Sequence, residues 1–152
     1  MGRTFSPSLI VTLNWSSIRA TAIRLQPGDD LKSELIRLAI DNQLRAATVM
    51  SAVGSLSEVS LRLAGCTEPT ILQGKHEIVS LVGTFSDDGI HLHMSVADSQ
   101  GNTIGGHVLE GSTIYTTAEL VIAEMNELVF TREWCSTTGY NELSVKPREQ
   151  IE

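Results

Sequence analysis

The spacing of apolar residues predicts one helix, across residues 27–44. Its apolar positions recur about one helical turn apart and form a single stripe, made by Leu31, Leu35, Leu38 and Ala39. Pro27 and Gly28 interrupt the segment that precedes them. The carboxylate of Asp29 or Asp30 can then accept the free amide protons of the first turn. The pattern therefore indicates a helix with one buried face and one solvated face.

The rest of the chain alternates between β-rich segments and short clusters of Gly, Asn, Asp and Ser. The β-rich segments cover residues 8–25, 46–63, 74–86, 91–111, 112–125 and 126–134. Residues 113–125 are long enough for a helix, but their β-branched content and period-two alternation favour a strand. These features predict an α+β fold, in which a mainly antiparallel β-sheet carries one principal flanking helix. We predict a single domain over residues 1–152, with its core at about 19–140 and a frayed charged tail at 146–152.

One predicted hairpin, HLHMSVADSQGNTIGGHVLEG at residues 91–111, carries three of the four histidines of the chain. Successive side chains of a strand point to opposite faces, so His91 and His93 share one face. If residues 98–102 form the loop, antiparallel pairing places His93 directly opposite His107, and all three imidazoles converge. Gly105 and Gly106 remove side chains next to His107, which leaves room for an ion or a small molecule.

Three neutral imidazoles with an open fourth position suit a divalent metal, of which zinc is the best match. The alternative is that these histidines are structural, because an HxH pair on a strand is common and a register slip of one residue would separate the rings. Glu110 lies on the opposite face of a regular strand, which favours a solvated acid over a general base. Asp98 is predicted to cap the loop. No GxSxG, P-loop or dinucleotide motif is present, so an enzymatic role is not favoured.

Composition limits the classes of partner. The chain has 18 acidic and 11 basic residues and a net charge of −7, which would repel a phosphate backbone unless the basic groups gathered on one face. The basic residues are instead scattered singly along the sequence. Two distant cysteines suggest neither a disulfide framework nor a thiolate metal site. Without a leader-like start or a run long enough to span a bilayer, we expect a soluble cytoplasmic protein with no membrane contact.

Several strings of the sequence resemble the plants-and-prokaryotes-conserved (PPC) domain family, from about Arg19 to about Tyr140. They are RLQPGDDL (24–31), AVGSLSEVSLRL (52–63), GKHEIVSLVGTFS (74–86) and the histidine hairpin (91–111), in the order and spacing of the family. The resemblance implies a mainly antiparallel sheet with a flanking helix, assembled as a homotrimer. In stand-alone prokaryotic members it also implies a metal held by the histidines of the HxH and GGH elements, which here are His91, His93 and His107. His76 stands where many relatives have an aromatic residue, and we interpret it as a packing residue; its role as a ligand is the minor alternative.

The resemblance also implies a link to DNA, because plant members carry AT-hook motifs and prokaryotic members are catalogued as predicted DNA-binding proteins. An AT-hook needs an Arg-Gly-Arg core, which this sequence lacks, so DNA binding is expected to be weak or indirect. A homotrimer agrees with the strand at 74–86, where Val79, Leu81 and Phe85 would share one face and Ile78 and Val82 the other. One helix cannot cover both faces.

Three functional classes therefore remain open. The first is a trimeric, metal-containing binding or regulatory module, and the second is a DNA-associated protein. The third is a metal-dependent enzyme that acts on a small molecule. The acidic charge balance counts against the second class, and the missing general base counts against the third.

Overall fold

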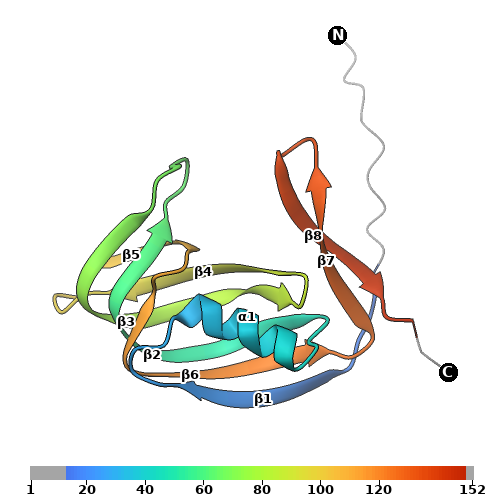
Figure 1. Cartoon of the computed structure of the whole chain (residues 1–152), viewed down its shortest axis with the longest axis horizontal. Helices are drawn as coiled ribbons and strands as arrows, with labels where there is room; N and C mark the ends of the chain where they lie inside the picture. The colour runs from blue at the N-terminus through green and yellow to red at the C-terminus, as the bar shows by residue number, and fades with distance from the viewer. Residues whose placement is uncertain (1–12, 150–152) are drawn as a thin grey trace, which may run out of the picture.

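The computed structural model describes residues 13–149, which fold around a twisted antiparallel sheet with one helix on it (Figure 1). The elements are β1 (Ile18–Leu25), α1 (Leu31–Asp41), β2 (Ala47–Arg62), β3 (Thr70–Ser86), β4 (Gly89–Ala97), β5 (Thr103–Val108), β6 (Thr113–Met125), β7 (Leu128–Cys135) and β8 (Tyr140–Pro147). The strand order of the main sheet is β1-β6-β2-β3-β4-β5, and β7 and β8 form a separate pair. The predicted α+β class and its single flanking helix are therefore confirmed. Residues 8–12 of the first predicted strand segment lie outside the described residues.

Helix α1 is shorter than predicted. It starts at Leu31 because Asp30 is the N-cap, where its carboxylate accepts the backbone N–H of Ser33 at 2.8 Å. It ends before Gln43, whose positive φ of 51° is incompatible with a continuing right-handed helix. The predicted apolar stripe is confirmed, since Leu31, Leu35 and Ala39 are fully buried against the sheet and Leu38 packs beside them.

The long strand β2 organises the sheet, because it pairs with β3 and β6 along its length and with β5 at its C-terminal end. Through this last pairing, strands β2 to β5 close on themselves around the apolar core. Leu61 of β2 faces Val108 of β5, and both side chains are buried. The next pair, Arg62 and His107, therefore points outward.

The predicted faces of β3 are confirmed for Leu81, Val82 and Phe85. They are exchanged for Ile78 and Val79, because a β-bulge lies between Ile78 and Ser80 in the pairing with β4. The bulge adds one residue and inverts the alternation, so Ile78 and Leu81 are both buried in the core. Val79 and Val82 are instead exposed, at 57% and 56%. These exposed apolar side chains therefore lie on the face of β3 that points away from α1.

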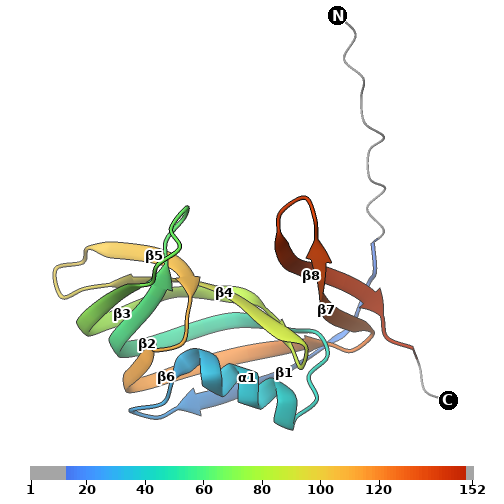
Figure 2. The same cartoon turned by 45° about the horizontal axis from the view of Figure 1, so that its top comes forward.

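The β7–β8 hairpin was only half predicted. Strand β8 has no counterpart in the sequence interpretation, and it pairs with β7 from Cys135–Tyr140 to Leu128–Pro147. The frayed tail expected from residue 146 is wrong for residues 146–148, because Lys146 and Pro147 end β8 and the backbone N–H of Arg148 donates to the carbonyl of Glu127 at 2.7 Å. The last three residues of that predicted tail, 150–152, lie outside the described residues. In both views the hairpin projects from the end of the main sheet (Figures 1 and 2). Within residues 13–149, no helix has the length and hydropathy of a membrane span.

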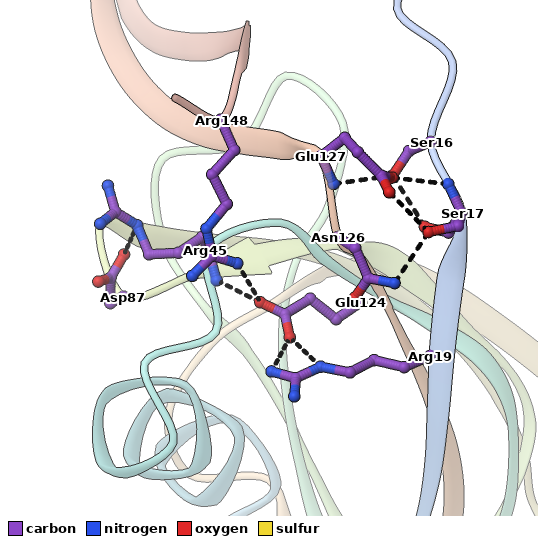
Figure 3. Close-up of polar contacts among 9 residues, drawn as sticks. All are labelled: Ser16, Ser17, Arg19, Arg45, Asp87, Glu124, Asn126, Glu127 and Arg148. Atoms are coloured by element: carbon purple, nitrogen blue, oxygen red, sulfur yellow. Dashed lines mark hydrogen bonds and ion pairs between the residues drawn. The ribbon is translucent and has the colours of Figure 1, made fainter. Parts of the chain in front are cut away.

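A buried carboxylate connects this hairpin to the sheet. Glu124 of β6 is 3% exposed and accepts hydrogen bonds from Nε and Nη2 of Arg19 at 2.8 and 2.5 Å (Figure 3). Its other oxygen accepts the backbone N–H of Arg45 at 2.9 Å and lies 3.8 Å from Nη1 of Arg148, just beyond β8. Glu124 therefore neutralises positive charge from β1 and from the end of the hairpin at one point.

Candidate metal centre

Strands β4 and β5 bring the three hairpin histidines together. His93 pairs directly with His107, which is the predicted register. Leu92 and Met94, on the other face of β4, are each 1% exposed, so the core fixes which way the strand faces. His91 and His93 are exposed and His107 is half-buried on the outer face of the sheet.

The loop between these strands is held by Asp98, as predicted. Its Oδ1 accepts the backbone N–H groups of Gln100 and Asn102 at 2.8 and 2.9 Å, and its Oδ2 accepts the side-chain amide of Asn102. These hydrogen bonds stabilise the carboxylate and lower the pKa of Asp98. A five-residue loop of fixed geometry keeps the register that places His93 opposite His107.

The three imidazole rings form a compact triangle. Their centroids lie 5.0 Å apart for His91 and His93, 5.0 Å for His91 and His107, and 5.6 Å for His93 and His107. One ring nitrogen from each histidine lies within 4.8 Å of a nitrogen of each other ring. The Nε2 atoms of His91 and His93 are 3.1 Å apart, close to the roughly 3.3 Å that separates two nitrogens bound to one tetrahedral zinc ion.

The surroundings of His107 and His91 favour the neutral form of these two rings. Burial, followed by repulsion from a protonated His91 and from Arg62, lowers the pKa of His107 to about 4. Burial and the neighbouring His93 likewise lower the pKa of His91. Neutral imidazole is the form that binds a metal, because protonation removes the lone pair. The Nδ1 atom of His107 is also buried without a hydrogen-bond partner in the described part of the chain, and a buried polar atom of this kind is costly. The donor set therefore fits a divalent metal.

Each pair of histidines borders its own hollow. His93 and His107 line a hollow of about 550 Å³ together with Gly105 and Gly106. His91 and His107 line another of about 420 Å³, and His91 and His93 a third of about 230 Å³. A Cβ atom at Gly105 would lie 2.6 Å from Oγ of Ser95, so a side chain cannot be added there without a shift. The triangle is thus accessible from several directions.

The other candidates of the sequence lie apart from the triangle. His76 is half-buried in β3, and its Nδ1 donates to the carbonyl of Gly74 at 2.9 Å. It is not part of the metal-capable group found among residues 13–149. Glu110 is exposed beyond the end of β5. The sequence interpretation missed Arg62 and Arg132, which line the hollow beside His91 and His107. Only long-range strand pairing brings them there, so no local sequence signal could have identified them.

The known proteins of related sequence are much longer than this chain, and each match covers only part of them. This chain is 50% identical over 130 positions to the bifunctional protein GlmU of Synechococcus sp. (strain JA-3-3Ab). The match covers 86% of this chain and 21% of that protein. This chain is also 34% identical over 90 positions to AT-hook motif nuclear-localized protein 10 of Arabidopsis thaliana, covering 53% of this chain and 25% of that protein. The chain thus spans only about a fifth to a quarter of the length of these curated relatives.

Solved structures share the whole fold. A hypothetical protein from Salmonella enterica is 44% identical with a TM-score of 0.87, covering 90% of this chain and 99% of that chain. A metal-containing protein from Archaeoglobus fulgidus is 19% identical with a TM-score of 0.77, covering 88% and 99%. A protein from Bacteroides thetaiotaomicron named as a candidate for DNA binding is 18% identical with a TM-score of 0.71, covering 86% and 98%. The last two show a common fold alone.

The family follows from a match that extends across most of the described chain. A model of the Plants and Prokaryotes Conserved domain matches residues 14–126, from the segment before β1 to the end of β6. This range includes the helix, all six strands of the main sheet and the three hairpin histidines. The chain therefore belongs to the Plants and Prokaryotes Conserved (PCC) domain family, the family also abbreviated PPC.

Proposed function

We propose that the protein is a homotrimeric binding or regulatory module that holds one divalent metal per subunit, with zinc as the preferred ion. His91, His93 and His107 are the proposed ligands. The observation that carries the proposal is the triangle of three imidazoles on one face of the β4–β5 hairpin. When bound, such an ion acts as a Lewis acid that attracts anionic or neutral donor atoms to its open coordination position.

The trimer is supported by the apolar side chains that the sheet leaves exposed. Helix α1 covers one face only, and the exposed apolar residues of β2 and β3 are Met50, Val53, Ile71, Val79 and Val82, each at least 47% exposed. Val82 pairs with His93 and therefore lies on the histidine face. Large apolar side chains that are about half exposed or more are of the kind that subunit contacts cover.

A DNA-associated function is the second candidate, because the family relatives include an AT-hook protein from Arabidopsis thaliana. The net charge of −7 and the absence of an Arg-Gly-Arg core in this sequence argue that any contact with duplex DNA is weak or indirect. A metal-dependent enzyme acting on a small molecule is a third alternative, which Glu110 does not support because it is exposed beyond β5.

The test combines metal analysis with solution mass. Purified protein, dialysed against a weak chelator, is expected to retain about one metal per subunit and to have a mass three times the 16.5 kDa of the chain. Substituting His91, His93 or His107 with alanine should weaken metal binding at least about tenfold, because even changes to outer groups cost that much. His76→Ala is the matched control and should keep its metal. A wild type without metal, or a His107→Ala variant that retains it fully, would overturn the metal assignment.

A further inference from the structure

Two arginines share a hollow with the histidine triangle. This hollow of about 420 Å³ lies beside His91 and His107. Arg62 enters it from the end of β2, where it pairs with His107. Arg132 enters it from β7, and Glu142 lies on its wall in β8. The hollow is therefore built by the main sheet on one side and the β7–β8 hairpin on the other.

The Arg132 side chain is held in place. Its Nη2 donates to the carbonyl oxygen and the Oγ1 of Thr84, at 3.2 and 3.0 Å. Its aliphatic part passes over Gly89, where a Cβ atom would lie 3.0 Å from Cγ of Arg132. A side chain at position 89 would crowd this path, so the glycine allows the guanidinium to reach the histidine face. Burial lowers the pKa of Arg132, which means that its charge is only partly compensated.

Neither arginine has a carboxylate partner within ion-pair distance among residues 13–149. Asp88 also borders the hollow, but its carboxylate accepts the backbone N–H of Arg132 at 2.8 Å. Without a metal, the two guanidinium groups balance the carboxylates of Asp88 and Glu142. A divalent ion bound by the three histidines would add positive charge to this balanced set and leave the hollow with a net positive charge.

We propose that this hollow binds a small oxyanion, a carboxylate or a phosphate, between the metal of the proposed centre and the guanidinium groups of Arg62 and Arg132. The inference rests on the proposed metal site. Guanidinium groups present paired N–H donors that match the oxygens of both anions. A volume of about 420 Å³ lies near the lower end of the range for small-molecule sites, which favours a small metabolite over a polymer segment.

The experiment measures whether an anion binds to a cobalt ion placed at the proposed metal site. The full chain is loaded with Co²⁺, free metal is removed, and the visible absorption is recorded while acetate or inorganic phosphate is added at constant ionic strength. We expect a saturable spectral change, because an added ligand alters the geometry of the ion. Acetamide, which is neutral and of similar size to acetate, should cause none. The arm that saturates at the lower concentration identifies the preferred anion.

Charge-removing variants test the two arginines. Arg62→Gln and Arg132→Gln should each weaken anion binding by about ten- to a hundredfold, as expected for the loss of a hydrogen bond to a charged group. Arg62→Gln has particular weight, because the Arg62 side chain makes no hydrogen bond or ion pair among residues 13–149 whose loss could disturb the fold. Arg24→Gln is the matched control, since Arg24 is exposed on β1 and donates to Thr117.

The outcomes separate this inference from the metal proposal. A protein that fails to bind Co²⁺ overturns both. A cobalt protein whose spectrum stays unchanged with acetate and phosphate overturns the oxyanion site alone. The oxyanion site is also overturned if Arg62→Gln and Arg132→Gln bind the anion as strongly as Arg24→Gln does. The cobalt ion would then bind the anion without help from the arginines.

Discussion

The buried carboxylate of Glu124 should contribute far more to stability than an exposed glutamate in a comparable ion pair. The substitution Glu124→Gln keeps the size of the side chain and removes its charge. The remaining carbonyl oxygen can face either the Arg19 guanidinium or the part-buried backbone N–H of Arg45, so the amide NH2 is left facing the other donor (Figure 3). Breaking a fully buried ion pair costs about 3–5 kcal/mol, and an unsatisfied buried donor about 1–3 kcal/mol.

The expected loss is at the lower part of this range, because Arg19 is 65% exposed and can be hydrated once its partner is gone. We expect the free energy of unfolding to fall by about 2–4 kcal/mol. For a chain of this size, that corresponds to a decrease in Tm of very roughly 5–15 °C. The measurement is urea unfolding followed by circular dichroism, at one protein concentration, since the proposed trimer would make stability depend on concentration.

Glu133→Gln is the matched control, because it makes the same chemical change in an exposed pair. Glu133 bonds Lys146 at 2.5 Å, and both side chains are more than half exposed. Such exposed pairs contribute little to stability, because solvent screens them, and they weaken further in salt. The reasoning is refuted if Glu124→Gln costs no more than Glu133→Gln, or if 0.5 M salt, which is about the range where surface pairs are screened, removes the difference.

Three further predictions follow from the same structure. In metal-free protein, folding lowers the pKa of His107 from 6.5 to about 4, so folding releases a proton between these pH values. The free energy of unfolding should therefore be highest above about pH 6.5 and fall progressively toward pH 4. His107→Gln should flatten this pH dependence in urea titrations. Gly83→Ala should destabilise the fold by more than about 2 kcal/mol in thermal unfolding, because its Cβ would lie 2.0 Å from a carbonyl oxygen of β4. Gly101→Ala is the control: its Cβ would meet open space, so only its positive φ should cost about 1 kcal/mol. Val82→Glu should convert the proposed trimer to the monomer mass in light scattering; an unchanged mass would exclude this face from the contact.

The sequence predicted best those features that depend on neighbours along the chain. The capping of the helix by Asp29 or Asp30, the loop closed by Asp98 and the pairing of His93 with His107 all follow from local rules of capping, turn chemistry and strand period. Each of these rules acts within about twenty residues. The geometry of the histidine triangle could therefore be predicted from the hairpin alone, because one short loop sets its register.

Features that depend on distant segments could not be predicted in this way. The bulge at Val79 lies in the pairing of β3 with β4, and no residue pattern within residues 74–86 predicts it. The sequence of β8 is mostly polar and does not indicate a strand, and its extended conformation is fixed by pairing with β7. In the sequence, Glu124 is one of several acidic residues in an alternating strand. Only the fold brings Arg19 and the backbone N–H of Arg45 to its carboxylate.

The proposed site combines both kinds of feature, and this explains why the metal ligands were predicted and the anion ligands were not. His91 and His93 are two residues apart, and a five-residue loop returns the chain to His107, so local geometry suffices. Arg62 reaches the same place only because β2 closes onto β5, and Arg132 only because the β7–β8 hairpin lies beside β4. In the proposed site, one hairpin supplies all three metal ligands. The proposed anion ligands come from the closed sheet and the projecting hairpin, so the specificity that we propose depends on the whole fold.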